Sequence, residues 1–457
     1  MSGADAIVAP MKPRESSPKP PRPELPTTPF LAKYHALFDE DDLWAAARQA
    51  GAVERQRKMD LPALVEASVL ALSGQPGTQT TILSHYMSLG GPPVASSSFY
   101  DRFTDEFATL MNELAGRAVL AVRAVEDDDA VAAHLGRLLE HFHDVRAVDS
   151  TCMVLQKLAA SWAPSTSTER PAGFKLHAVV SLRDGLPVEA HLSPQREHDS
   201  PHVDEEALEA GTLFMGDLGY VDEKRVIRLV DRDVHVLMRL KKSQDPIIHR
   251  VHIGRGDKKA CRGKTLDAAF AEGLLDFAQG AIDLAVVIEA GGERRILRVT
   301  GVSNGTTYAD AWFYLTSVPR DVLDPEGVSV AYTMRWDIEL LWKHLKTGAG
   351  MAAMRAWKPE AVRALVNAKI IGVALGRLLE LCAKEETKGH AMGQLAIMLS
   401  LNRMTPLIIA MRLRQRGVSL AVMEHRFLTM ASILARSRRQ RRERTKRQKR
   451  ERLRRDA

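Results

Sequence analysis

The stretch from Val328 to Thr347, VSVAYTMRWDIELLWKHLKT, most constrains the fold, because its polar and apolar residues recur with helical spacing. At about 100° per residue, one tyrosine, one glutamate and three cations fall within about 80° of one another. These residues are Tyr332, Arg335, Glu339, Lys343 and Lys346. The apolar residues Ile338, Leu341, Trp342 and Leu345 share a neighbouring face. The pattern predicts a single helix with one buried stripe and one chemically rich face.

Such a face suits a site that holds a metal ion together with a polyphosphate backbone. The alternative is a solvated surface helix that carries an ordinary ion pair between Glu339 and Lys343, four residues apart. The choice depends on whether the rest of the chain supplies further carboxylates in suitable places.

The spacing Tyr-x2-Arg-x3-Glu-x6-Lys resembles the signature helix of the insertion-sequence DDE transposases of the IS-four family. The segments WFYLTS (residues 312–317) and KTGAG (residues 346–350) are similar to that family as well. The resemblance implies an α/β fold in which an RNase H-like catalytic core is interrupted by a β-rich insertion domain. Helical N-terminal and C-terminal domains would flank that core.

Two aspartates follow short apolar runs that have the character of strands. Asp149 lies in VRAVDSTCMVL, and Asp217 follows TLFMG. With a hairpin turning at Asp184-Gly185, a helix at 204–211 and a strand at 234–242, the order of elements is that of an RNase H-like core. The family fold then implies that the strands carrying the two aspartates are neighbours and that Glu339 lies beside them. One aspartate at a strand end is weak evidence alone, because aspartate often caps or turns there.

Three carboxylates meet the needs of phosphodiester cleavage by two Mg²⁺ ions, which prefer oxygen ligands. The predicted catalytic and metal-binding residues are Asp149, Asp217 and Glu339, with Mn²⁺ as a substitute for Mg²⁺. The resemblance implies that Arg335 and Lys346 hold a DNA phosphate, that Tyr332 contacts the same DNA and that Lys343 touches the backbone. It also implies that Trp312 stacks on a flipped base, although core packing in a strand is the alternative. The run HFHD, residues 141–144, is better explained as a helix end than as a metal site.

The remaining segments divide the chain into regions. We expect a disordered leader at 1–30, a helical DNA-binding domain at 31–140, the core at 141–242 and 326–357, the insertion domain at 243–325, helices at 358–435 and a basic tail at 436–457.

In the second region, residues 31–140, Ser97 or Ser98 is expected to cap a long helix with the stripe Phe99, Phe103, Phe107, Leu110 and Leu114. A helix-turn-helix and a plain helical bundle both fit this pattern. The cationic run at 251–264 is either a phosphate contact or a solvated loop.

Charge is distributed unevenly along the 457 residues. The net charge is +7, but residues 436–457 carry 13 Lys and Arg against three acids, which leaves −3 for the rest of the chain. That tail is either a basic arm for DNA or a solvated charged helix. The three cysteines form no paired motif, which fits a reducing cytosol. The absence of a signal peptide core and of long apolar runs predicts a cytoplasmic protein without a membrane segment. The family resemblance implies that it associates with the bacterial nucleoid.

The sequence therefore predicts a cut-and-paste DNA transposase that cleaves transposon ends, passes through a hairpin and joins the 3′-hydroxyl ends to target DNA. Its partners would be double-stranded DNA and a second copy of the chain in a synaptic complex. One alternative is an RNase H-like nuclease without strand transfer. Another is a catalytically inactive DNA-binding protein that inhibits transposition.

Overall fold

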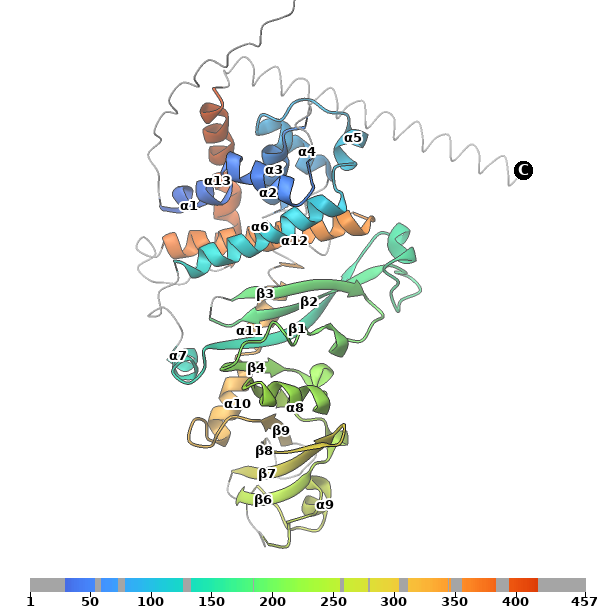
Figure 1. Cartoon of the computed structure of the whole chain (residues 1–457), viewed down its shortest axis with the longest axis vertical. Coiled ribbons are helices and arrows are strands. Elements are labelled where there is room, and N and C mark those ends of the chain that lie inside the picture. The colour runs from blue at the N-terminus through green and yellow to red at the C-terminus, as the bar shows by residue number, and fades with distance from the viewer. Residues whose placement is uncertain are drawn as a thin grey trace, which may run out of the picture.

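The computed structural model describes residues 29–53, 59–72, 79–125, 133–183, 185–254, 259–277, 280–303, 311–343, 345–346, 356–383 and 394–417. They form an elongated molecule with a helical layer at one end and a long sheet that runs away from it (Figure 1). The predicted basic tail lies outside these residues, as does the leader apart from Pro29 and Phe30, which begin the first helix. None of the described helices is long and apolar enough to cross a membrane.

The sheet has nine strands in the order β3-β2-β1-β4-β5-β9-β8-β7-β6. Its first half comprises β1 (Asp144–Val154), β2 (Gly173–Ser181), β3 (Leu186–Pro194), β4 (Thr212–Gly216) and β5 (His235–Arg239). Strands β1, β2 and β3 are antiparallel, whereas β1, β4 and β5 run parallel. This is the RNase H-like arrangement, so the predicted core and the predicted side-by-side placement of its first and fourth strands are confirmed.

Local sequence explains these strands. All five residues of β4, TLFMG, are buried, as expected for a short apolar run inside a parallel sheet. The predicted hairpin joins β2 to β3, and Gly185 adopts a φ of +68°, a conformation that favours glycine over residues with a side chain. Asp184 lies outside the described residues.

The predicted helix at 204–211 is wrong: these residues form turns. The side chain of Asp204 accepts a hydrogen bond from the Glu206 amide, a local turn that competes with helix formation. Glu205 meanwhile pairs with Arg225 and Arg228 of α8 (Glu223–Asp231), which fixes the turn against that helix. Tertiary ion pairing therefore overrides the local helical pattern.

The second half of the sheet comes from the region between the core strands and the signature stretch. It consists of β6 (Ile247–Ile253), β7 (Ala281–Ala290), β8 (Glu293–Ser303) and β9 (Ala311–Thr316), with α9 (Leu266–Ala271) packed alongside. Strand β9 pairs with both β5 and β8, so these strands extend the core sheet instead of forming a detached one. All four strands lie within residues 243–325, the region that the sequence predicts to be β-rich.

A buried carboxylate fixes this half to the chain that follows it. Asp283 on β7 is fully buried, and both of its oxygens accept hydrogen bonds from Arg298 on β8 at 2.9 Å. Arg298 also donates to the Leu323 carbonyl at 2.6 Å, just before α10 (Pro325–Thr333). The start of the signature stretch is thus held by the extended sheet.

Helices from both ends of the chain form the layer above β3 and β2 (Figure 1). They are α1 (Pro29–Leu37), α2 (Glu40–Gln49), α3 (Leu61–Leu72), α4 (Gln79–Ser88), α5 (Ser96–Tyr100), α6 (Asp105–Arg123), α12 (Pro359–Cys382) and α13 (Gln394–Gln415), with α7 (Ala133–Leu139) leading into β1. Helices α6 and α12 lie side by side across this layer. The N-terminal and C-terminal helices therefore share one core.

The helix predicted to start at Ser97 or Ser98 is in fact two helices. Helix α5 ends at Tyr100, and α6 begins with Thr104 as its N-cap, whose side chain accepts a hydrogen bond from the Phe107 amide. The predicted apolar stripe is nevertheless buried along its whole length: Phe99, Phe103, Phe107, Leu110 and Leu114 are each at most 2% exposed. Its spacing therefore identified the buried face, although it did not locate the break between the two helices.

A buried ion pair connects the two ends of the chain. Glu66 of α3 is fully buried and accepts hydrogen bonds from Arg412 of α13 at 2.8 Å and from the Tyr34 hydroxyl of α1 at 2.9 Å. Arg412 also donates to the Phe38 carbonyl at 2.6 Å. Burial raises the pKa of Glu66, and Arg412 and Tyr34 oppose that rise.

Replacing Arg412 with methionine should lower the free energy of unfolding by about 3–5 kcal/mol, because it leaves the Glu66 carboxylate buried without its cation. The measurement is denaturant unfolding followed by circular dichroism. Arg414→Met, at an exposed position of the same helix, is the matched control and should change stability by about 0.5 kcal/mol or less. The double variant Arg412→Met/Glu66→Leu should recover most of the loss; a double variant as unstable as the single one would contradict this account.

Candidate active site

Two aspartates emerge side by side from neighbouring parallel strands. Strand β1 pairs with β4 up to the partners Val148 and Gly216, and Asp149 and Asp217 each follow directly after them. Gly216 has little room for a side chain, since a Cβ there would lie 3.2 Å from Tyr220 and 3.3 Å from Val148. The close approach of β4 to β1 thus helps to bring the two carboxylates together, as the sequence predicts.

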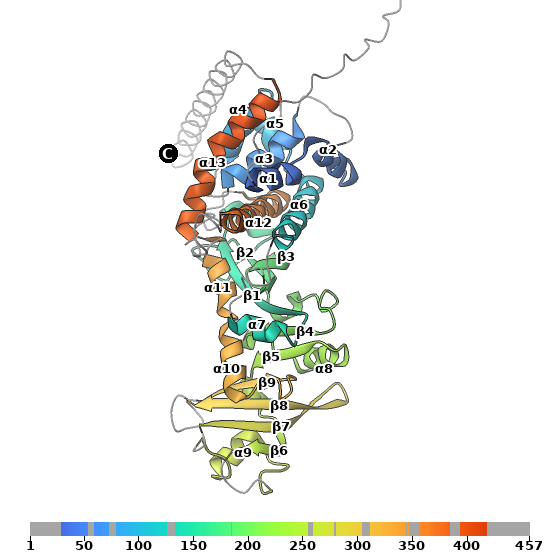
Figure 2. The ribbon, with the colours of Figure 1, turned by 90° about the vertical axis from the view of Figure 1, so that its left-hand side faces the viewer.

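The signature stretch passes the strand ends as two helices, α10 and α11 (Trp336–Lys343), and not as the one continuous helix that its periodicity predicts. The break lies at Met334 and Arg335, whose amides bond three residues back, to the carbonyls of Ala331 and Tyr332. Figure 2 shows α10 and α11 end to end along the sheet, from β9 to the helical layer. The predicted apolar stripe is buried: Ile338, Leu341, Trp342 and Leu345 are at most 5% exposed.

Each aspartate receives a hydrogen bond from an aromatic side chain of these helices. The Tyr332 hydroxyl donates to Asp217 Oδ1 at 3.2 Å, and Trp342 Nε1 donates to Asp149 Oδ2 at 3.1 Å. Burial and the adjacent Asp217 raise the pKa of Tyr332, so that its phenol stays protonated and serves as a donor. The aromatic groups therefore orient both carboxylates and leave one oxygen of each for a further ligand.

Arg335 lies among the carboxylates. Its guanidinium donates to Glu339 Oε1 at 2.9 Å and lies 3.9 Å from Asp149 Oδ2. It also lies over the Tyr332 ring, 5.6 Å from its centroid. Burial alone would lower the pKa of Arg335, but Tyr332, Glu339 and the two aspartates together raise it. Arg335 is thus a permanent cation that links the third predicted acid to the first.

Two acids of the site, Asp149 and Glu339, differ in the exposed fraction of their side chains. The Asp149 side chain is 22% exposed and that of Glu339 is 47% exposed. Burial raises the pKa of Asp149, while the Ser150 amide, Arg335 and Trp342 act in the opposite direction. A second positive charge, such as a metal ion, would further stabilise the charged form of Asp149.

The other predicted DNA contacts lie outside this cluster. Lys343 is exposed and Lys346 is half-buried, and the described contacts join neither to the three acids. Trp312 on β9 is 45% exposed, and the Arg239 guanidinium of β5 lies 5.2 Å from its ring centroid. Core packing, the alternative for Trp312, does not describe this side chain. The cationic run at 251–264 lies partly outside the described residues, and Lys264 pairs with Glu272 at 2.8 Å.

The structure also assigns roles that sequence reasoning missed. Trp342 appeared only as a member of the apolar stripe, yet its indole N–H is the donor to Asp149. Asp144, from the HFHD run, accepts hydrogen bonds from Ser181 and Arg146 at 2.9 Å, which makes it a structural residue at the start of β1. A Trp three residues after the glutamate was the available signal for the first role, since a buried indole usually finds an acceptor.

The three acids offer the donor chemistry of a hard divalent cation, but their oxygens do not all lie within 4.8 Å of one another, so a metal would have to draw them together. Asp149, Asp217 and Glu339 supply carboxylate oxygens, which Mg²⁺ and Mn²⁺ prefer over nitrogen or sulfur. In the arrangement described here, Arg335 supplies the positive charge beside two of these acids. Residues Asp149, Asp217 and Glu339 would hold the metal, and Glu339 would then share its charge between the metal and Arg335.

Comparison with known proteins identifies the family. The model of the transposase DDE domain matches residues 140–374, more than half of the chain and all three acids. The chain therefore belongs to the transposase DDE domain family. Its membership agrees with the resemblance to insertion-sequence transposases that the signature residues indicate.

The sequence identity to individual relatives is either low or confined to a short segment. The chain is 39% identical over 61 residues to the putative transposase InsL of element IS186A from Escherichia coli K12, a match covering 13% of this chain and only 16% of that relative. It is 20% identical over 385 residues to the transposase of element IS231F from Bacillus thuringiensis subsp. israelensis, covering 76% of this chain and 79% of that protein. A solved structure of the piggyBac transposase synaptic complex with hairpin DNA aligns with a TM-score of 0.45 and 8% identity over 89% of this chain and 86% of that one, a likeness too weak to define a fold.

Replacing Arg335 with alanine should make the protein less stable without metal but more responsive to metal. Loss of the guanidinium leaves Asp149 and Glu339 without their shared cation, at a cost of about 1–3 kcal/mol. It also removes the positive charge that a metal ion must approach, so Mn²⁺ and Mg²⁺ should raise the melting temperature more than they do in the unmodified protein. The measurement is thermal unfolding across a metal titration.

Arg363→Ala, which removes an exposed ion pair with Asp105, is the control and should leave the metal response unchanged. The double variant Arg335→Ala/Glu339→Ala should lose the enhanced response. An equal metal response in Arg335→Ala and the unmodified protein would show that the guanidinium does not compete with a metal at these acids.

Proposed function

We propose that this protein is a cut-and-paste DNA transposase that cleaves transposon ends and joins their 3′-hydroxyls to target DNA. The observation that carries the proposal is that Arg335 lies between Asp149 and Glu339, while Asp217 follows the parallel strand next to that of Asp149. Membership of the transposase DDE domain family supports it, and so do the transposase relatives.

When bound, two divalent ions at such a carboxylate site activate the attacking oxygen and stabilise the leaving oxygen of the phosphodiester. The chain's own residues would do the rest. Trp342 and Tyr332 hold the aspartates in place, and Arg335 offers a charged donor to a phosphate oxygen. Lys346 and Lys343 lie beyond them in the chain and would contact the DNA backbone.

The same site would perform successive reactions. Water attacks the phosphodiester at the transposon end and releases a 3′-hydroxyl. This hydroxyl attacks a phosphodiester of the opposite strand, which closes the transposon end into a hairpin and releases the flanking DNA with a 3′-hydroxyl. A second hydrolysis opens the hairpin. The 3′-hydroxyl finally attacks a target phosphodiester and joins the two DNAs, with two copies of the chain pairing two ends.

The surrounding regions would bind the DNA on which this site acts. Residues 31–140 are proposed as a DNA-binding domain, residues 243–325 as the insertion domain and residues 358–435 as a region of subunit contact. The protein would act on the bacterial nucleoid.

Replacing a single acid should abolish chemistry and preserve DNA binding. Asp149→Ala, Asp217→Ala and Glu339→Ala each remove a metal ligand that contributes several kcal/mol to the transition state, so cleavage should fall on the order of 10³-fold or more. The assay is a labelled duplex from the DNA flanking the gene, incubated with and without Mg²⁺, beside a gel-shift measurement of binding.

Glu326→Ala, an exposed acid on α10, is the matched control and should cleave normally. If Asp149→Ala still cuts DNA, the site assignment fails. Metal-dependent nicks without joined product would favour the nuclease alternative, and binding without cleavage in Mg²⁺ or Mn²⁺ would favour an inactive inhibitor of transposition.

Trp312 tests the hairpin step separately. Its half-exposed ring, held by Arg239, can stack on an extruded base, a contact worth about 1–3 kcal/mol. Trp312→Ala should therefore lower hairpin formation roughly tenfold or more while first-strand nicking persists. Trp312→Phe should retain most hairpin product, and equal losses of nicking and hairpin in Trp312→Ala would point to a structural role instead.

A further inference from the structure

Three histidines lie close together on the sheet, beside Ser150, the residue that follows Asp149 of the candidate active site. His177 on β2 is the register partner of His191 on β3, and His202 reaches them from the turn of residues 200–202. The His177 ring is stacked on that of His202, with centroids 4.3 Å apart, and on that of His191, 5.0 Å apart. One ring nitrogen from each of the three lies within 4.8 Å of the other two, the one such group of potential ligands among the described residues.

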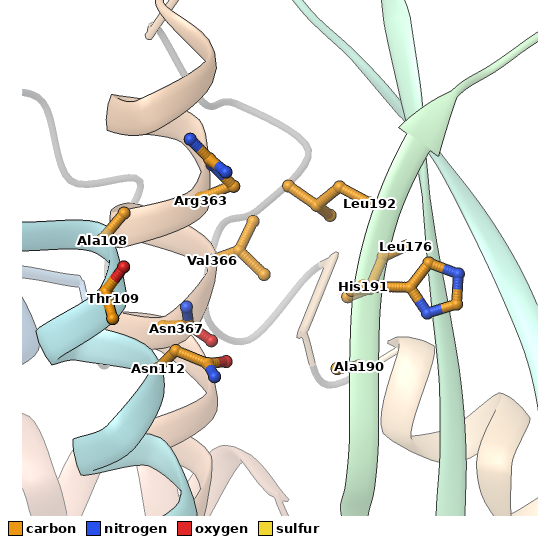
Figure 3. A pocket seen from close by; sticks show the side chains of 10 residues that line it. All are labelled: Ala108, Thr109, Asn112, Leu176, Ala190, His191, Leu192, Arg363, Val366 and Asn367. Atoms are coloured by element: carbon orange, nitrogen blue, oxygen red, sulfur yellow. The ribbon is translucent and has the colours of Figure 1, made fainter. Parts of the chain in front are cut away.

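The cluster lies on the face of the sheet opposite to Asp149. Ser150 pairs with His177, whereas Asp149 pairs with Ala178, and successive residues of a strand point to opposite faces. Figure 3 shows the His191 ring directed away from α12, although His191 is among the residues that line the cavity of about 370 Å³ between that helix and the sheet. The histidine rings therefore lie on the opposite face of the sheet from Asp149.

Each imidazole has one nitrogen engaged by an outer partner. His177 Nε2 lies 2.8 Å from Ser193 Oγ, His202 Nε2 lies 3.0 Å from Glu197 Oε2, and His191 Nδ1 lies 3.5 Å from Glu189 Oε1. Metal-binding histidines characteristically use their second nitrogen in this way, which orients the ring and makes the first nitrogen a better ligand.

The remaining nitrogen of His177 is a polar atom without a hydrogen bond. His177 is fully buried and its Nδ1 is unsatisfied, 3.9 Å from Asp199 Oδ1. Burial and the two neighbouring histidines lower the pKa of His177 to about 3. A buried ring nitrogen without a hydrogen-bond partner is a costly arrangement unless a ligand satisfies it.

We propose that His177, His191 and His202 bind one divalent transition metal of the zinc class, with water in the fourth position. Three imidazoles suit Zn²⁺, Co²⁺ or Ni²⁺ and not Mg²⁺, which prefers oxygen. His191 and His202 are partly exposed, which gives the ion a route in from solvent. Because the rings are stacked, their in-plane nitrogens do not converge on one point, so bonds of about 2.0–2.1 Å require the histidine side chains to rotate as well as to draw together.

The ion would link residues 195–203 to β2 and β3, on the face of the sheet opposite to Asp149. Asp199 in this segment accepts hydrogen bonds from Ser150 at 2.8 Å and from Lys175 at 2.9 Å. Ser150 is the neighbour of Asp149, and Asp199 also lies close to Gly219, two residues after Asp217. Pinning His202 to the sheet would therefore stiffen the backbone that carries both aspartates.

The test uses the full chain without a histidine tag, stripped of metal by a chelator and titrated with Co²⁺ and Zn²⁺. We expect one tightly bound equivalent, a Co²⁺ absorption spectrum typical of low coordination number, and no displacement by excess Mg²⁺. His202→Ala should lose this equivalent. Glu197→Gln, which removes only the outer partner of His202, should weaken metal affinity about 10–100-fold.

His198→Ala is the matched control, because it removes an exposed histidine of the same segment and should bind Co²⁺ as the unmodified protein does. Asp149→Ala should also retain the full equivalent, which separates this site from the acid site whether or not the protein cleaves DNA. Absence of a stoichiometric Co²⁺ or Zn²⁺ equivalent, or a His202→Ala variant that binds as before, would overturn the proposal and leave a stack of neutral histidines.

Discussion

The geometry of the candidate site depends on one buried guanidinium. Arg335 links Glu339 to Asp149 and lies over the Tyr332 ring, which in turn holds Asp217. Acids gathered at strand ends repel one another, and a fixed internal cation offsets that repulsion. The break between α10 and α11 falls at this residue, so the backbone itself bends where the cation must enter the cluster.

The outer half of the sheet is in contact with the helices that carry the candidate site. Strand β9 pairs with β5, and Tyr314 on β9 packs against Tyr332 with ring centroids 4.9 Å apart. The Asp283–Arg298 pair then fixes the chain just before α10. The strands of region 243–325 therefore support the signature helices from below while the helical layer supports them from above. A substitution in the outer strands would therefore act on Asp217 through the contact of Tyr314 with Tyr332.

Elements with strong local patterns were predictable, whereas those decided by tertiary contacts were not. The apolar runs before Asp149 and Asp217 and the stripe through Ile338 predicted buried strands and a buried helix face. The turn at 204–211, the cap at Thr104 and the break at Arg335 depend on partners remote in sequence or on single hydrogen bonds, which periodicity does not reveal. Family resemblance supplied the adjacency of the acids. It did not indicate Trp342 as the donor to Asp149, because that role arises from how α11 crosses β1.

The three histidines show most clearly that sequence patterns do not reveal contacts set by tertiary structure. His177, His191 and His202 are separated in the chain and form no motif, yet the register of β2 with β3 makes two of them direct neighbours. Their side chains lie on the opposite face from Asp149 because strand alternation separates Asp149 from Ser150. Asp149 therefore points to the face of the acid site, whereas Ser150 points to the face of the three histidines. Ions sort between such faces by hardness, since Mg²⁺ prefers carboxylates and zinc-class metals accept imidazole. The proposed zinc-class ion at the histidines and the proposed hard ion at the acids would therefore be sorted by their direct ligands, with the carboxylates of Glu197 and Asp199 serving only as outer partners of the histidines.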